Sequence, residues 1–182
     1  MKVTEGKKIY FASDNHLGIP DSRSSLAREK KFVRWLDTVK VDAHSIYLLG
    51  DLFDFWFEYK TVVPKGFTRV LGKIAELSDS GIPIYFFTGN HDMWVRDYFQ
   101  LELGVKVITE PQQFKINEKS FFIGHGDGLG PGDTSYKLMK KFITTNKFFK
   151  WFFRWVHPDI GGQTWSISFK RKKVNVSEER HW

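Results

Sequence analysis

The stretch IPIYFFTGNHD (residues 82–92) joins a short apolar run to a polar turn. The run is rich in β-branched and aromatic residues, which is typical of a buried strand. The turn holds Asn90, His91 and Asp92, whose side chains can bind metal ions or phosphate. Gly-Asn occurs in ordinary turns, but His-Asp rarely follows it there at the end of a buried strand. We therefore interpret this stretch as a strand that delivers residues to a functional site.

Three further strands are predicted, and each runs into polar residues. KIYFAS (8–13) precedes Asp14, SIYLLG (45–50) precedes Asp51, and KSFFIGHGDG (119–128) carries His125. Strands that alternate with helices indicate an α/β fold, and ligands of open α/β sheets bind beyond the carboxyl ends of the strands. We expect the four polar loops to converge there.

Two segments between the strands have the apolar spacing of helices, at residues 24–38 and 67–79. We expect Ser24 or Ser25 to cap the first helix, because serine side chains accept hydrogen bonds from free backbone N–H groups. The second helix is expected to end at Gly81, since glycine tolerates the left-handed backbone that terminates helices.

The composition limits the classes of protein that this chain can belong to. Its 182 residues predict a single domain, residues 1–182, and the absence of cysteine excludes disulfides, thiolate metal sites and a cysteine nucleophile. A formal charge of +7 favours an anionic partner, whether nucleic acid, phosphorylated metabolite or lipid surface. No segment reaches the about 20 apolar residues of a spanning helix, and no signal peptide is recognisable, so we expect a cytoplasmic protein.

The polar residues at the strand ends suit a divalent metal. Asp14 and His16 are two residues apart, so on an extended loop they point to the same side. Together with Asp51, Asn90 and His125 they form a mixed set of donors that fits Mn²⁺, Fe²⁺ or Zn²⁺, and Asp51 could bridge two ions. Taken singly, each motif could equally be a solvated loop, and His125 a buried structural histidine. Their order and spacing together indicate a metal site.

In this order and spacing the motifs resemble those of the calcineurin-like metallophosphoesterase family. The resemblance implies a layered α/β sandwich of two β-sheets flanked by helices, and a two-metal phosphoesterase. By resemblance, Asp14 and His16 would bind the first metal, Asp51 would bridge, and Asn90 and His125 would bind the second.

The resemblance also assigns residues that bind no metal. His91 would contact the phosphate and stabilise or protonate the leaving oxygen. Asp54 or Asp92 could orient a histidine through a hydrogen bond, as carboxylates near metal sites often do. For Asp54, an equal alternative is that it caps the N-terminus of a helix.

Three blocks resemble one branch of the family, the UDP-2,3-diacylglucosamine diphosphatases of lipid A biosynthesis. They are GDLFDFW (50–56), SDSGIPIYFFTGNHD (78–92) and HGDGLGPGDTSY (125–136). The resemblance implies Mn²⁺-dependent hydrolysis of the pyrophosphate of UDP-2,3-diacylglucosamine, giving UMP and 2,3-diacylglucosamine 1-phosphate. A phosphodiesterase or phosphatase for a soluble nucleotide, and a binding module with an incomplete metal site, remain as alternatives.

The same branch implies contacts to the substrate. They would be made by Asn90, His91, Asp133, Tyr136, Lys140 and Lys141. For Tyr136, the alternative is a residue that packs a helix.

Two features depart from the family pattern. Well-known members of the branch carry arginine where this chain has His91. The wider family also has a later Gly-His-x-His turn, and neither His157 nor His181 lies in such a motif. We therefore expect a C-terminal portion of the fold to be missing.

The run FFKWFFRW (148–155) has six aromatic rings in eight residues. It lies in a region rich in Lys and Arg, from Lys137 to Lys173, where Asp159 is the only acidic residue. Such a segment can pack as core, lie on a membrane surface or bind nucleic acid. Because the motifs point to a diacylated substrate, we interpret residues 131–173 as a helical lid. We expect the protein to associate peripherally with the bacterial inner membrane, and do not favour nucleic acid.

Overall fold

The computed structural model of the chain describes residues 1–19 and 21–127, which belong to one compact unit, Met1–Thr134. The predicted lid at residues 131–173 lies outside the described residues, as do the predicted substrate contacts Asp133, Tyr136, Lys140 and Lys141. Within the described part, no helix has the length and apolar character needed to cross a membrane.

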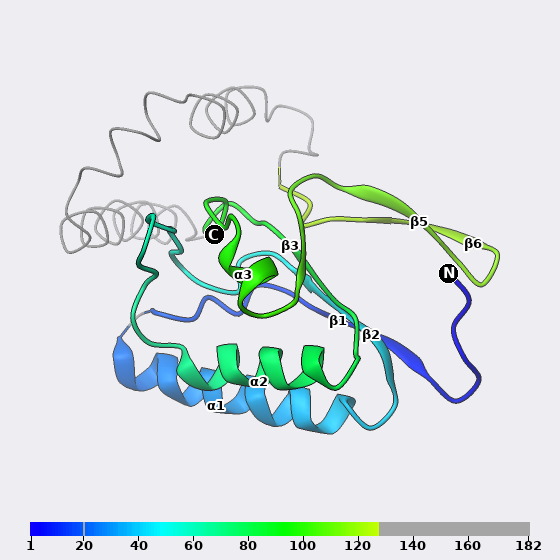
Figure 1. Cartoon of the computed structure of the whole chain (residues 1–182), viewed down its shortest axis with the longest axis horizontal. Coiled ribbons are helices and arrows are strands. Elements are labelled where there is room, and N and C mark those ends of the chain that lie inside the picture. The colour runs from blue at the N-terminus through cyan, green and yellow to red at the C-terminus, as the bar shows by residue number, and fades with distance from the viewer. Residues whose placement is uncertain (20, 128–182) are drawn as a thin grey trace, which may run out of the picture. The chain divides into compact units, whose positions relative to one another are not determined.

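The described residues form a parallel sheet, a separate β-hairpin and three helices (Figure 1). The parallel sheet has the strand order β1-β2-β3-β4, and β5 and β6 pair in antiparallel fashion. The elements are β1 (Lys8–Ala12), α1 (Ser22–Val39), β2 (Ala43–Leu49), α2 (Thr68–Asp79), β3 (Ile84–Phe87), α3 (Tyr98–Leu101), β4 (Lys106–Ile108), β5 (Gln112–Ile116) and β6 (Lys119–Ile123).

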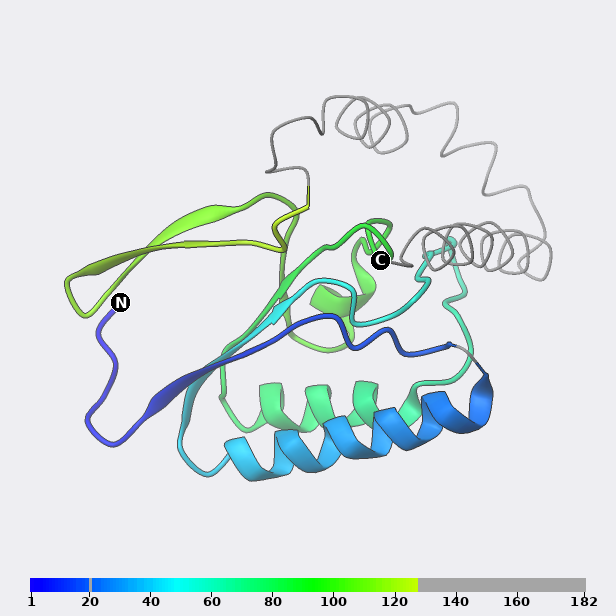
Figure 2. The ribbon, with the colours of Figure 1, turned by 180° about the vertical axis from the view of Figure 1, so that it is seen from behind.

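Helices α1 and α2 lie side by side on one face of the parallel sheet (Figures 1 and 2). Ile46 and Leu48 of β2 face the helices, because alternate residues of a strand point to opposite faces. They join one core cluster with buried helix residues such as Leu36 and Ile74. Tyr47, between them in the chain, belongs to a second cluster on the other face. Because both faces of the sheet are buried, the sequences of these strands are continuous apolar runs and do not alternate with polar residues.

The second helix ends as predicted, with Gly81 in left-handed backbone (φ 85°) just after α2, but the start of the first helix differs from the prediction. Asp21 caps α1, and its Oδ1 accepts hydrogen bonds from the backbone N–H groups of Arg23 and Ser24, at 2.9 and 3.0 Å. The expectation that Ser24 or Ser25 is the cap was therefore wrong, because the helix begins two residues earlier than predicted. The first turn of α2 has no cap from its own chain segment, and buried Glu29 of α1 accepts two of its backbone N–H groups instead.

The fourth predicted strand is β6, and it does not join the parallel sheet. It pairs with β5 across a tight turn at Asn117 and Glu118, which both have positive φ (43° and 67°). That backbone matches the right-handed twist of hairpin strands. Helix α3 and strands β4 and β5 were not anticipated, since they are short and lack a clear apolar period.

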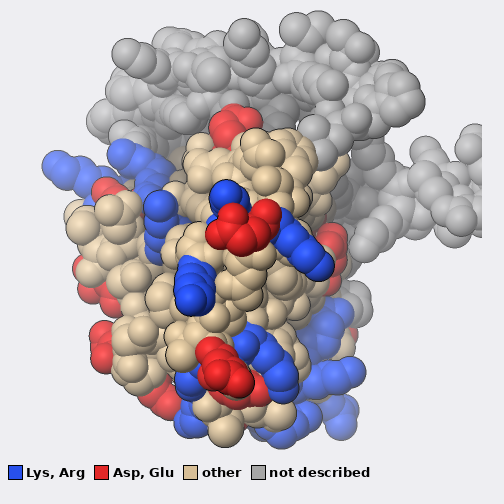
Figure 3. All heavy atoms as spheres, turned by 90° about the vertical axis from the view of Figure 1, so that its right-hand side faces the viewer, with Lys and Arg blue, Asp and Glu red and all other residues tan. Residues whose placement is uncertain are grey.

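Acidic and basic side chains are interspersed on the face that carries the tip of this hairpin (Figure 3). At the tip itself, Lys115 of β5 forms an ion pair with Glu118 (2.9 Å). Neither sign of charge therefore dominates this face.

Candidate metal centre

The loops after β1 and β2 are held together by backbone hydrogen bonds. The N–H groups of Asp14 and His16 donate to the carbonyl oxygens of Gly50 and Asp51, at 3.2 and 2.9 Å. Asp14, His16 and Asp51 all adopt left-handed backbone, with φ of 55°, 43° and 52°. That conformation is costly for residues other than glycine and persists where the surrounding structure enforces it. The candidate ligands are thus the strained residues of these loops.

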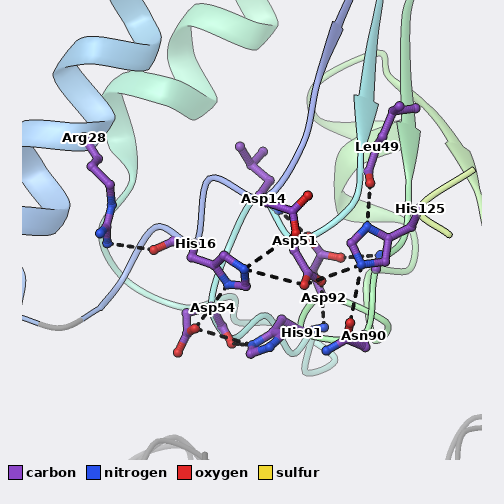
Figure 4. A network of polar contacts seen from close by, with 12 residues as sticks. Asp14, His16, Arg28, Leu49, Asp51, Asp54, Asn90, His91, Asp92 and His125 are labelled. Atoms are coloured by element: carbon purple, nitrogen blue, oxygen red, sulfur yellow. Dashed lines mark hydrogen bonds and ion pairs between the residues drawn. The ribbon is translucent and has the colours of Figure 1, made fainter. Parts of the chain in front are cut away.

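Asp51 occupies the middle of the site (Figure 4). Its Oδ1 accepts a hydrogen bond from the backbone N–H of His91 (3.0 Å), which orients the buried carboxylate. Its Oδ2 lies 3.8 Å from Nε2 of His16 and 3.5 Å from Nε2 of His125. One carboxylate oxygen therefore lies between two imidazole rings from different loops.

Two clusters of donors meet at Asp51. On one side, Asp14 Oδ1 lies 3.9 Å from His16 Nε2, and the donor atoms of Asp14, His16 and Asp51 all lie within 4.8 Å of one another. On the other side, Asn90 Oδ1 lies 3.4 Å from His125 Nε2. Oxygen and imidazole donors at these separations fit a divalent cation of borderline hardness in each cluster.

A hydrogen bond sets the orientation of His125. Its Nδ1 lies 2.7 Å from the carbonyl oxygen of Leu49, the last residue of β2, and a carbonyl can only accept. Nδ1 therefore carries the proton and Nε2 faces Asp51 and Asn90. This is the usual way in which proteins aim a histidine at a metal.

Glycine is required where the loops after β2 and β3 touch. A Cβ on Gly50 would lie 2.7 Å from both Gly89 N and His125 Nδ1, and Gly50 also has a φ of 83°. A Cβ on Gly89 would meet the backbone and carboxylate of Asp51. The close approach that brings Asp51 next to Asn90 thus depends on two missing side chains.

The carboxylate of Asp92 links the loop after β2 to the loop after β3. Its fully buried carboxylate accepts hydrogen bonds from Gly89 N (2.7 Å) and Leu52 N (2.9 Å). Burial raises its pKa to about 7, although these backbone donors favour the ionised form. The described contacts of Asp92 are to the backbone and not to a histidine.

Asp54 is the carboxylate that lies beside the histidines. Its Oδ1 is 3.3 Å from His16 Nδ1 and 3.4 Å from His91 Nδ1, and its backbone carbonyl oxygen is 2.7 Å from His91 Nδ1. The two rings meet edge to face, with centroids 4.8 Å apart. No helix begins at Asp54, so the alternative that it caps a helix was wrong.

The charged side chains of the site shift the pKa values of His16, His125 and Asp51. The contact with Asp54 raises the pKa of His16, against the opposing effect of burial. A hydrogen bond to Asp51 raises the pKa of His125 to about 9. Burial opposes ionisation of Asp51, but His125 and the N–H of His91 together lower its pKa. Because a histidine must lose its proton to bind a metal, metal binding at His16 and His125 would compete with protonation.

One residue of the site was missed from the sequence. Arg28 of α1 donates through Nη2 to the carbonyl oxygens of His16 (2.8 Å) and Ile19, and so holds the loop that carries Asp14 and His16. A sequence signal was present, since Arg28 lies one helical turn before Phe32, on the face of α1 that is buried.

Comparison with known proteins agrees with this geometry. Residues 7–175 match the model of the calcineurin-like phosphoesterase family. The chain belongs to this family. The resemblance inferred from the motifs is confirmed, and so is the α/β fold with a parallel sheet and a second sheet.

Several curated relatives of this chain carry one name, UDP-2,3-diacylglucosamine hydrolase. The protein of Porphyromonas gingivalis is 41% identical over 91% of this chain and 64% of its own length. That of Histophilus somni is 33% identical over 81% of this chain and 60% of its own length. That of Vibrio vulnificus is 30% identical over 79% of this chain and 57% of its own length. The chain thus spans about three fifths of the length of these relatives.

The structure brings together every predicted site residue that it describes. They are Asp14, His16, Asp51, Asp54, Asn90, His91, Asp92 and His125, from the ends of β1, β2, β3 and β6 (Figure 4). His125 reaches the site from the hairpin and not from a fourth parallel strand.

Proposed function

We propose that this chain is a two-metal phosphoesterase that hydrolyses the pyrophosphate bond of UDP-2,3-diacylglucosamine. The products are UMP and 2,3-diacylglucosamine 1-phosphate. The observation that carries the proposal is the position of Asp51 Oδ2 between His16 Nε2 and His125 Nε2, at 3.8 and 3.5 Å. A carboxylate oxygen shared by two donor clusters is what a pair of bridged cations requires. The names of the curated relatives support the choice of substrate.

Each cluster would hold one divalent cation, with Mn²⁺ the first choice and Fe²⁺ or Zn²⁺ next. Asp14 and His16 would hold the first, Asn90 and His125 the second, and Asp51 both. Bound cations would supply activation of water and neutralisation of phosphate charge.

His91 is the proposed general acid. The contact of its Nδ1 with the backbone carbonyl oxygen of Asp54 (2.7 Å) fixes the ring and leaves the Nδ1 proton in place. A proton given to the leaving oxygen would then pass through Nε2. The Asp54 carboxylate lies beside both rings, 3.3 Å from His16 Nδ1 and 3.4 Å from His91 Nδ1.

The remaining assignments rest on the sequence. We propose that residues 1–182 act as one domain, with residues 131–173 as a basic aromatic lid over the substrate. Within it, Asp133, Tyr136, Lys140 and Lys141 would contact the nucleotide sugar. The rings of FFKWFFRW would meet the acyl chains and associate the protein peripherally with the inner membrane.

The decisive experiment is release of UMP from UDP-2,3-diacylglucosamine in the presence of Mn²⁺. We expect the Asp51→Asn variant to lose both turnover and Mn²⁺ binding, because the bridging oxygen loses its charge. Asp79→Asn is the matched control, since Asp79 is exposed at the end of α2 and lies outside the site.

Three outcomes separate the alternatives. Release of UMP from the diacylated substrate, abolished in Asp51→Asn, supports the proposal. Turnover of unacylated UDP-sugar alone would make the protein a phosphodiesterase for soluble nucleotides. Absence of both Mn²⁺ binding and turnover in the folded protein would make it a binding module.

A further inference from the structure

The outer side of helix α1 carries a line of basic side chains. Arg23, Lys30 and Arg34 are seven and four residues apart, so the helical repeat places them on one side of α1. All three are exposed, and the buried residues of the helix, such as Phe32 and Leu36, lie on the opposite side. No carboxylate in residues 1–19 and 21–127 forms an ion pair with any of the three. The line is therefore uncompensated positive charge.

The stability of α1 does not explain this line of cations. Arg23 lies in the first turn, where the helix dipole favours acidic side chains, and that turn contains no acidic residue. Lys30 and Arg34 are one helical turn apart, a spacing at which like charges repel each other. Both placements work against the helix, which points to a partner outside it.

Two further exposed cations extend this charge to the start of α2. Lys65 and Arg69 line a cavity of about 400 Å³ together with the first turns of α1 and with Gly18. Gly18 follows His16 by two residues, so the cavity adjoins the loop that carries the first donor cluster. Within the described part of the chain, neither Lys65 nor Arg69 forms an ion pair with a carboxylate. We call the five exposed cations the basic surface: Arg23, Lys30, Arg34, Lys65 and Arg69.

The carboxylates beside the basic surface bind backbone groups instead. Asp21 caps α1, and buried Glu29 accepts two backbone N–H groups at the start of α2. The far ends of the two helices differ, because cations and carboxylates pair there: Asp37, Lys40, Lys73 and Glu76. Helices α1 and α2 run in the same direction, and α1 begins directly after the loop of Asp14 and His16 (Figures 1 and 2). The positive charge thus lies at the end of the helices that is nearer to the metal centre.

We propose that the basic surface docks on an anionic lipid bilayer and turns the metal centre towards it. Cations in a line on the outer side of a helix can all contact a flat array of lipid phosphates at once, and each adds to the attraction. Among the described residues, no exposed aromatic ring lies on α1 or α2, whereas single-stranded nucleic acid binds by stacking on such rings. The choice of lipid also rests on the proposed function, because a substrate with two acyl chains partitions into a membrane.

The basic surface and the aromatic run at residues 148–155 would bind a bilayer by different forces. Electrostatic attraction is screened by salt, with a Debye length of about 8 Å at 0.15 M and about 3 Å at 1 M. Burial of apolar rings is not screened in this way, because it depends on the area removed from water. The salt dependence of binding therefore separates the two contributions within one protein.

The test is co-sedimentation of the intact chain with phosphatidylcholine vesicles that contain either no anionic lipid or about 30% phosphatidylglycerol. A triple variant, Arg23→Gln with Lys30→Gln and Arg69→Gln, should bind the anionic vesicles on the order of 100-fold more weakly at low salt, about 5-fold for each side chain. Its release of UMP from detergent-dispersed substrate should match the wild type, because these side chains lie outside the metal centre. A double variant, Arg34→Gln with Lys65→Gln, removes the other two cations and should weaken binding about 25-fold.

A second triple variant, Lys2→Gln with Lys106→Gln and Lys119→Gln, is the matched control. It removes the same charge from exposed lysines that lie before β1 and at the first positions of β4 and β6, outside α1 and α2. Binding to anionic vesicles should stay within about 3-fold of the wild type, because charges beyond a Debye length from the bilayer contribute little. Both triple variants change only exposed side chains and should unfold at the same urea concentration.

The outcomes separate this surface from the proposed reaction. Loss of binding in the basic-surface variants alone, with the difference removed at about 1 M NaCl, supports the proposal. Equal vesicle binding by the two triple variants would overturn it. If short RNA or DNA binds the wild type more tightly than anionic vesicles do, and the basic-surface variants lose that binding, the surface is a nucleic-acid interface and the lipid assignment is wrong. Vesicle binding that responds as expected, in a protein that releases no UMP, would sustain the surface and reject the proposed reaction.

Discussion

Replacing Arg28 by glutamine should weaken one of the two metal clusters and leave the other intact. The Nη2 of Arg28 donates to the carbonyl oxygens of His16 and Ile19, both in the loop between β1 and α1 that carries the first cluster. That loop holds Asp14 and His16 in left-handed backbone, at a cost of about 1–3 kcal/mol each. Without its anchor, the loop can relax away from the geometry that binds metal.

The size of the effect follows from these two bonds. A hydrogen bond to a charged group contributes about 1.5–3 kcal/mol, and the shorter glutamine cannot span both carbonyls. Because an amide can still satisfy one carbonyl or be replaced by water, we expect part of the sum to be lost. Groups that orient metal ligands typically change affinity about 10- to 100-fold, and we expect this range for Arg28→Gln.

The assay is titration of Mn²⁺ into metal-stripped protein, followed by calorimetry. We expect the binding step of the Asp14 and His16 cluster to weaken and the other step to persist. An Asn90→Ala variant, which removes a donor of the second cluster, identifies the steps. Arg34→Gln is the matched control, since Arg34 is exposed on the same helix. Two unchanged steps in folded Arg28→Gln would refute the anchoring argument, and equal weakening of both would show a general loss of structure.

Substitutions at four further positions test the site and its support. Gly89→Ala should lower the free energy of unfolding by about 1–3 kcal/mol, since its Cβ would meet the backbone of Asp51. Gly72→Ala, in open space on α2, should instead raise it by about 1 kcal/mol, as measured by urea unfolding. Glu29→Ala removes the acceptor for two N–H groups of α2 and should cost about 0.5–2 kcal/mol in the same assay, whereas Glu29→Gln should cost less. In the metal-free chain, His125 has a pKa raised from 6.5 to about 9, so its stabilising contribution is complete below pH 6.5 and is lost as pH rises through about 9. Unfolding measured across this window should show the decline, and His125→Gln should remove it.

Each of these expectations can fail on its own. A fully stable Gly89→Ala protein would mean that the loops after β2 and β3 are less closely packed than described. Equal effects of the two Glu29 variants would locate its role in packing and not in hydrogen bonding. A flat pH dependence in wild type would show that His125 does not hold the extra proton.

Much of this site was predictable because its signals are local in the chain. Apolar runs identified β1, β2, β3 and β6, and the polar residues after them supplied the ligand candidates. The turn at Asn90 and His91 was informative for the same reason, since its residue types are uncommon after a buried strand. For the loops after β1, β2 and β3, convergence followed from a general property of parallel sheets, whose strands all end at one edge.

The tertiary structure decided the relations between segments that are distant in the chain. Local periodicity cannot tell which strand pairs with which, so the sequence did not show that β6 leaves the parallel sheet and forms a hairpin with β5. Nor could it distinguish Asp54, which lies between two histidines, from Asp92, which binds backbone N–H groups. The sequence likewise did not show what Arg28 and Glu29 bind, because their partners lie on segments that only the packing of α1 brings close. The sequence by itself determined which donors this protein can offer to a metal. Only the packing of the loops decided that Asp51 lies between two imidazoles, because that position depends on contacts between three loops at once.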